Sequence, residues 1–175
     1  MAEAQARASE AAMPVLPLTE AAALLPARGA LIGLDLGTKT IGVATSDPER
    51  RLAAPVETIG RTKFTADAGR IMQLARERRA AGFVLGLPIS MDGSEGPRAQ
   101  ATRAFARNLA RQTELPIALW DERLSTAAAE RALIGADVSR TRRKEVIDQH
   151  AAVFILQGAL DRLAKADLQP KRRDG

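Results

Sequence analysis

The sequence of 175 residues has no cysteine, no tyrosine and a single histidine, His150. The absence of cysteine excludes disulfides and thiolate metal sites, and one histidine is too few for the usual nitrogen and sulfur ligands of zinc. A bound metal would therefore be a hard cation held by oxygen ligands, such as Mg²⁺ or Mn²⁺. Only 3% of the residues are aromatic, which disfavours a single-strand binder that stacks bases on an aromatic platform.

The sequence also has no long hydrophobic run. No stretch approaches the ~20 apolar residues that a membrane span needs. Nothing near the N-terminus resembles a signal peptide. The segment carries three acidic residues, Glu3, Glu10 and Glu20, and its apolar run over residues 21–25 is too short for the hydrophobic region of such a peptide. We therefore expect a soluble cytoplasmic protein without a membrane partner.

Positive charge is in modest excess. Lys and Arg total 26 against 21 Asp and Glu, which gives a net charge of +5. Most of the cations are Arg, whose planar guanidinium suits phosphate. A GC-rich genome, which favours Arg and Ala codons, explains this composition equally well, so charge alone does not decide the function.

The length fits one domain with a single hydrophobic core, and 46% of the residues are apolar. We expect a partly mobile N-terminal extension over residues 1–28, a domain over 29–166 and a basic tail over 167–175. Within the extension, residues 20–25 are predicted to form a short helix with Thr19 as its N-cap.

Hydrophobic periodicity predicts three strands, then two helix–strand units, then helices to the end. Pro55 in the third strand predicts an edge position. This order predicts an α/β fold: a mixed five-stranded sheet, three antiparallel strands followed by two parallel ones, with helices on both faces. The predicted strands cover residues 30–36, 40–45, 52–59, 82–87 and 116–120. The predicted helices cover residues 65–79, 98–112, 125–134 and 143–165. Ser125 or Thr126 is expected to cap the third of these helices, and a polar loop over residues 135–142 to follow it.

Asp35 lies inside an apolar strand, in the segment IGLDLGTKT. An ionised carboxylate is costly there unless something pairs with it. One interpretation is a metal ligand that projects from the sheet, beside glycines that let a phosphate approach the backbone. The alternative is that Asp35 accepts the backbone N–H groups of residues 37–39 and so caps the turn.

A second acid follows the last predicted strand, in the segment LWDERLST. Ligands of open α/β sheets gather at the carboxyl ends of the strands. Asp121 and Glu122 are both candidates, but successive side chains point to opposite faces, so we expect only one of them at the site. The pattern alone does not choose between them, and either could instead stabilise the dipole of the following helix.

Asp148 is the third candidate, because it precedes the apolar run AAVFIL on the last predicted helix. A surface acid on the polar stripe of that helix is the alternative. Glu145 is one helical turn away and is a candidate auxiliary ligand. Three carboxylates suit two Mg²⁺ ions about 4 Å apart that cleave a phosphodiester. His150 is then expected at the edge of the site, as an auxiliary residue at most.

Basic residues stand beside each of these motifs. Arg140, Arg142, Arg143 and Lys144 come just before Asp148, and such a run would hold phosphates beside a metal centre. A solvated helix start is the alternative. Three further candidates for phosphate contacts adjoin the other motifs: Lys39, Arg98 and Arg123.

With these motifs in view, the sequence resembles the YqgF family, described as pre-16S ribosomal RNA nucleases and Holliday-junction-resolvase-like proteins. The matching segments span about residues 32–160 in the family's order: IGLDLGTKTIGVATSD, FVLGLPISMDGSEGPRA, LWDERLSTAAAERAL and VIDQHAAVFILQGAL. The resemblance implies a ribonuclease-H-like fold and a catalytic, metal-binding triad of Asp35, Glu122 and Asp148. Asp121 then becomes a supporting residue.

Two features depart from the family's pattern. Ser90 stands where the family often has Asn, and Gln149 and His150 follow Asp148 where a small residue such as Ser is usual. Neither departure removes a carboxylate.

The resemblance implies a metal-dependent endonuclease that processes the 5′ end of precursor 16S rRNA in ribosome biogenesis. The alternative with the same chemistry is a Holliday-junction resolvase acting on branched DNA, which would favour a homodimer over a monomer because two strands are cut. Another class is a non-catalytic nucleic-acid-binding factor that affects transcription or ribosome assembly. A sugar kinase or actin-like ATPase, suggested by DLGTKT, would need two domains around a nucleotide, and the sequence predicts one.

Overall fold

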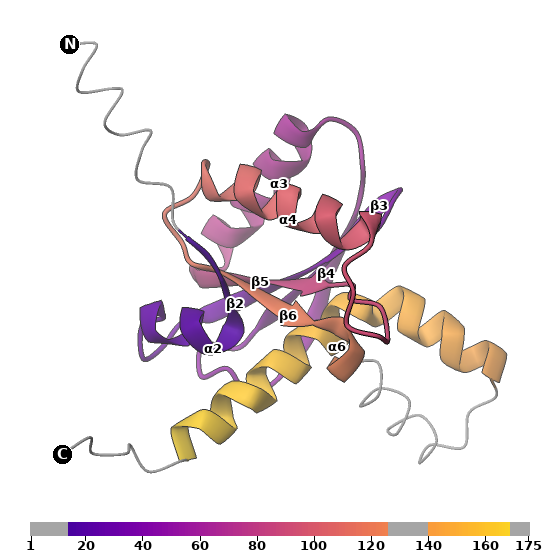
Figure 1. Cartoon of the computed structure of the whole chain (residues 1–175). Helices are drawn as coiled ribbons and strands as arrows, with labels where there is room; N and C mark the ends of the chain where they lie inside the picture. The colour runs from indigo at the N-terminus through magenta and orange to yellow at the C-terminus, as the bar shows by residue number, and fades with distance from the viewer. Residues whose placement is uncertain (1–13, 126–139, 169–175) are drawn as a thin grey trace, which may run out of the picture.

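The computed structural model describes the backbone of residues 14–125 and 140–168, and the side chains of residues 14–125 and 150–167. A twisted mixed sheet forms the centre, with helices on both faces (Figure 1). The strands are β1 (Val15–Pro17), β2 (Ala30–Leu36), β3 (Thr40–Ser46), β4 (Ala53–Gly60), β5 (Ala80–Leu87) and β6 (Ile117–Asp121). The helices are α2 (Leu18–Ala21), the 3-10 turn η1 (Ala22–Leu24), α3 (Phe64–Glu77), α4 (Pro97–Ala110) and α6 (Arg140–Leu168).

The strand order is β1-β6-β5-β2-β3-β4. Strands β2, β3 and β4 form an antiparallel meander, and β5 and β6 run parallel to β2. The predicted mixed sheet is therefore confirmed, and so is the edge position of the strand that contains Pro55. Because β2, β5 and β6 are parallel, their carboxyl ends lie at the same edge of the sheet.

The N-terminal segment supplies a strand that was not predicted. Val15–Pro17 pairs in parallel with the start of β6, so the sheet of the described residues has six strands instead of five. The short helix predicted over residues 20–25 is present but shifted, as α2 and η1 over residues 18–24, and its predicted N-cap at Thr19 is wrong, since α2 begins at Leu18 after Pro17 and no side chain caps it. Pro17 ends β1 and its fixed φ suits the start of a helix, which explains the shift.

Helices lie on both faces of the sheet (Figure 1), and a cluster of buried apolar side chains fills each side. Helices α3 and α4 cover one face, where the inward side chains of β2 include Ile32, Leu34 and Leu36. Helix α6 and the short α2 cover the other face, where α6 contributes Ile155 and Leu156. Strand alternation places Asp35 and Leu31 on this second face, the face of α6.

Helix α6 lies close to the sheet because β2 carries a glycine beneath it. A Cβ atom at Gly33 would come within 2.7 Å of Leu156 Cβ, so only glycine allows this approach. Gly33 precedes Asp35 by two residues and therefore faces the same side of the sheet. The close packing fixes how α6 passes over the part of β2 that carries Asp35.

Helix α6 differs from the predicted helix in two ways. It begins at Arg140, so the predicted loop over residues 135–142 is wrong for residues 140–142. It also bends at His150, whose φ of −121° and ψ of 18° are not helical, and the two arms run in different directions in Figure 1. No helix of the described chain is long and apolar enough to cross a membrane.

Candidate active site

Asp35 lies next to the last residue of β2, opposite Gly42 of β3. A Cβ atom at Gly42 would lie 3.6 Å from Asp35 Cβ and 3.4 Å from Ala152 Cβ of α6. Asp35 thus lies between the sheet and the helix, half-buried. In the following turn the Gly37 N–H donates to the Thr40 carbonyl at 2.9 Å, so this N–H is taken by the backbone.

Glu122 follows the last residue of β6 and begins a helix over residues 122–125. Its side chain lies over Gly86 of β5, since a Cβ atom there would come within 2.7 Å of Glu122 Oε1 and 2.5 Å of Ile155 Cδ1. Asp35 and Glu122 therefore come from parallel strands whose carboxyl ends share one edge. They interact through a hydrogen bond between their carboxyl groups.

Asp121 serves a different purpose from Glu122. Its carboxylate accepts the Arg123 backbone N–H at 3.0 Å, as an N-cap does, and also binds the Arg123 guanidinium. The guanidinium beside it holds the pKa of Asp121 below its usual range. Ser125 is the fourth residue of the helix that begins at Glu122, so it is not the N-cap of that helix, and its hydroxyl accepts the Trp120 indole N–H. The rest of the predicted helix over residues 125–134 lies outside the described residues. Thr126 lies outside the described residues.

Burial raises the pKa of Glu122 to about 7, and the negative charge of Asp35 adds to the effect. The positive charge of Arg98 lowers the pKa of Glu122, and the hydrogen bond to Asp35 raises it. Near neutral pH this pair of carboxyl groups therefore holds a proton or needs an additional positive charge. A divalent cation bound by both groups would supply that charge, and oxygen donors are the ligands that Mg²⁺ and Mn²⁺ prefer.

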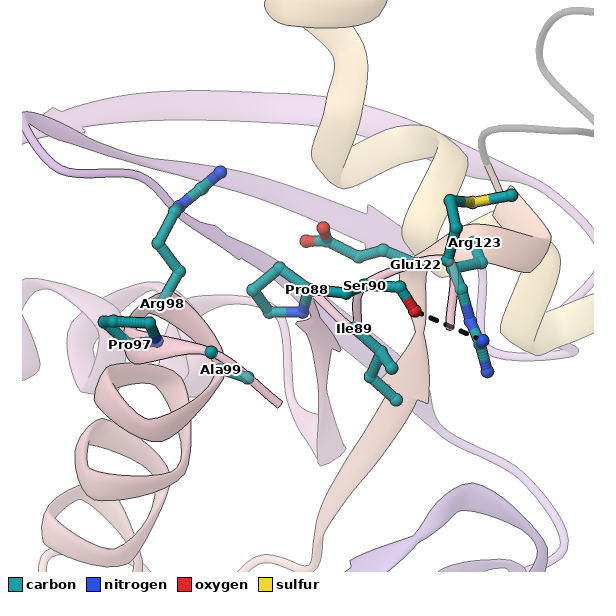
Figure 2. A pocket seen from close by; sticks show the side chains of 10 residues that line it. Pro88, Ile89, Ser90, Pro97, Arg98, Ala99, Glu122 and Arg123 are labelled. Atoms are coloured by element: carbon teal, nitrogen blue, oxygen red, sulfur yellow. Dashed lines mark hydrogen bonds between the residues drawn. The ribbon is translucent and has the colours of Figure 1, made fainter. Parts of the chain in front are cut away.

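A pocket of about 600 Å³ opens beside Glu122. Figure 2 shows the Glu122 carboxylate directed into it, toward the side on which Arg98 of α4 lies. The connection between β5 and α4, residues 88–96, forms the opposite wall. The pocket is lined by Pro88, Ile89, Ser90, Met91, Gly96, Pro97, Arg98, Ala99, Glu122 and Arg123.

The predicted phosphate contacts are distributed unevenly. Arg98 and Arg123 both line the pocket, and Arg123 is held by Asp121 and donates to the Ser90 carbonyl at 3.4 Å (Figure 2). Lys39 is exposed in the β2–β3 turn and is not part of the pocket.

Several predicted residues have side chains outside the described part of the chain. Asp148, Glu145, Arg142, Arg143 and Lys144 lie in α6, and only their helical backbone is described.

His150 is described, and with Gly42 it lines a smaller pocket of about 240 Å³ between β3, β4 and α6. Among the described side chains, no group of three or more acids and histidines could hold a metal.

Two features of the site were not predicted from sequence. Gly86 makes room for Glu122, and a glycine inside the continuous apolar strand GFVLGL is the signal that indicates such a close approach. The apolar wall formed by Ile89 and Met91 had no such signal, because it depends on how the loop over residues 88–96 folds.

The fold and the site define the class of protein. The structure is similar to RuvC of T. thermophilus, solved in complex with a Holliday junction substrate, with a TM-score of 0.54 and 12% identity. The similarity covers 80% of this chain and 97% of RuvC. It shows the fold alone, and the predicted ribonuclease-H-like fold is confirmed.

The chain belongs to the RuvX family, described as Holliday junction resolvase, which matches residues 29–162. A protein of Rhodopseudomonas palustris (strain BisB5), named "Putative pre-16S rRNA nuclease", is 75% identical over 86% of this chain and 94% of its own length. A protein of Nitrobacter winogradskyi with the same name is 77% identical over 86% of this chain and 92% of its own length. The family resemblance predicted from the sequence is confirmed.

Proposed function

We propose that this protein is a metal-dependent endonuclease that hydrolyses phosphodiester bonds in precursor 16S rRNA, at its 5′ end. The observation that carries the proposal is the half-buried pair of carboxyl groups at Asp35 and Glu122. Both lie at the carboxyl edge of parallel strands, where open α/β sheets bind their ligands. The names of the relatives that are at least 75% identical support the substrate.

Asp35, Glu122 and Asp148 are the proposed metal ligands and catalytic residues. Asp148 comes four residues before Ala152, which lies against Gly42 and so next to Asp35. Bound Mg²⁺ or Mn²⁺ would activate the attacking water and neutralise the leaving oxygen. The three carboxylates would hold the metal ions beside the scissile phosphate, and Glu122 must lose its proton to take part.

The basic residues are the proposed phosphate contacts. Arg98 is exposed at the rim of the pocket and acts on the charge of Glu122, so a phosphate bound there would lie close to the carboxyl pair. Arg123 and Lys39 would contact the strand further away. Arg142, Arg143 and Lys144 would add to this surface from the start of α6, and Glu145 and His150 are proposed auxiliary residues.

The second candidate function is resolution of Holliday junctions, which the description of the matching family favours. It would use the same residues on branched DNA, as a homodimer with two active sites; RNA processing needs only a monomer. Either substrate would place the protein in the cytoplasm. A non-catalytic factor that binds nucleic acid is the third candidate.

The test is cleavage of a labelled precursor 16S rRNA and a labelled four-way DNA junction, with Mg²⁺ or Mn²⁺. The variants are Asp35→Asn and, as a matched control, Asp161→Asn, which changes an exposed acid of α6. We expect cleavage of the RNA by wild type and the control and none by Asp35→Asn. Cleavage of the junction alone would favour the resolvase. Binding without cleavage, unaffected by Asp35→Asn, would favour the non-catalytic factor.

A further inference from the structure

The pocket beside Glu122 has features that a site for phosphates alone does not need. Its wall is largely apolar, with Pro88, Ile89 and Met91 on one side and Pro97 and Ala99 on the other. The Met91 side chain is 88% exposed, so a ligand in the pocket can contact it directly. A phosphate is hydrated and charged, so it gains nothing from this wall.

Hydrogen bonds on both sides hold the apolar wall in place. Glu95 pairs with Arg103 of α4, with Oε2 3.1 Å from Nη2. The Ser94 N–H donates to Asp92 Oδ1 at 2.9 Å, and the Ser90 carbonyl accepts from Arg123. The pocket is therefore formed before a ligand arrives, which lowers the entropic cost of binding.

The open side of the pocket carries positive charge. Helix α4 begins at Pro97, and its N-cap is Gly96, which has no side chain that could cap the helix. The positive end of a helix of 14 residues thus lies at the rim together with the exposed Arg98. An apolar wall next to a cationic rim is complementary to a nucleotide, with the base against the wall and the phosphate at the rim.

We propose that this pocket receives one unpaired nucleobase of the RNA strand whose phosphodiester lies at Asp35 and Glu122. The inference rests on the proposed nuclease function and adds a recognition subsite to it. Sequence-specific recognition of RNA commonly uses bases that leave their stack and enter such pockets. Here aliphatic side chains take the place of aromatic rings, and about 600 Å³ is ample space for one base.

The test measures binding of short single-stranded RNA to the Asp35→Asn variant in Mg²⁺, so that no strand is cut. A series of otherwise identical strands carries 2-aminopurine at successive positions, because this base becomes more fluorescent when it leaves its stack. We expect the fluorescence to rise at one position only. Removing the base at that position should weaken binding about tenfold.

The Met91→Ala substitution, added to Asp35→Asn, tests the wall itself. It should weaken binding of the intact strand about threefold and leave binding of the abasic strand unchanged, as coupled sites in a double-mutant cycle do. Leu52→Ala is the matched control, because Leu52 is another exposed large apolar residue, 72% exposed, outside the pocket. It should have no effect on either strand.

An equal response at every position, or no response at any, would overturn the proposal, as would equal losses for Met91→Ala and Leu52→Ala. The readout is binding and does not depend on cleavage. If wild type cuts neither the precursor 16S rRNA nor the DNA junction but the fluorescence still rises at one position only, the proposed nuclease function is refuted and the base pocket is not. Cleavage of precursor 16S rRNA without that response would refute the base pocket alone.

Discussion

Replacing Glu122 by Gln removes a charge that the folded protein accommodates poorly. The pKa of Glu122 is about 7 in the folded chain against 4.5 for an ordinary Glu. The folded state therefore binds the proton more tightly than the unfolded state. As a result the free energy of unfolding falls as the pH rises from about 4.5 to about 7 and stays lower above that range.

The size of this effect follows from the pKa difference. Each unit corresponds to about 1.4 kcal/mol, so the charge of Glu122 costs the folded protein about 3 kcal/mol above pH 7. Gln has nearly the same shape and no charge. Without divalent cations, Glu122→Gln should therefore be about 2–3 kcal/mol more stable than wild type near pH 8 and nearly equal to it near pH 4.5.

The assay is thermal unfolding followed by circular dichroism, with a chelator present, at about pH 4.5 and about pH 8. For a domain of this size, the gain at the higher pH corresponds to a rise in Tm of about 5–10 °C. Glu114→Gln, at an exposed position before β6, is the matched control and should leave Tm unchanged at both pH values.

Added Mg²⁺ extends the same reasoning. Saturating Mg²⁺ should stabilise wild type near pH 8 by about 2–3 kcal/mol, as a ligand does at about 100 times its Kd. It should stabilise Glu122→Gln much less, because one charged oxygen ligand is lost. If Glu122→Gln gains no stability relative to wild type as the pH rises, the reasoning about the carboxyl pair is wrong.

Two further predictions concern how the site and the core are supported. Gly86→Ala would place a Cβ atom 2.7 Å from Glu122 Oε1, so cleavage should fall by about 10- to 100-fold. The control Gly60→Ala has open space around it and should cleave like wild type. If Gly86→Ala cleaves as fast as Gly60→Ala, Glu122 tolerates displacement. Leu18→Ala should lower the free energy of unfolding in denaturant by about 2–4 kcal/mol, because Leu18 of α2 is 3% exposed, and a loss below about 0.5 kcal/mol would show that α2 is not part of the core.

The central strands and helices could be predicted from local pattern. The strand Ala30–Leu36 was predicted with the observed bounds, and the other predicted strands differ by a residue or two at their ends. Apolar alternation and turn residues are properties of neighbouring positions, so a single sequence carries them. The same is true of Asp35, which stands out because a charge interrupts an apolar strand.

The elements that were missed depend on distant partners. Val15–Pro17 has no periodicity of its own and becomes a strand only because β6 offers an edge for pairing. The bend of α6 at His150 is likewise absent from the apolar pattern, which continues through it. Short segments and bends take their conformation from tertiary contacts, which override local propensity.

The sequence by itself determined five strands of the sheet, the α/β class, the family and the acids that could act. Local pattern left Asp121 and Glu122 open, and the family resemblance implied Glu122. Only the tertiary structure showed the physical difference, since Asp121 pairs with Arg123 whereas Glu122 lies against Asp35. It also brought the loop over residues 88–96 and the start of α4 together as a pocket. The reason is physical: the pKa of a carboxyl group and the shape of a pocket depend on burial and on neighbours far away in the chain, which local patterns do not record.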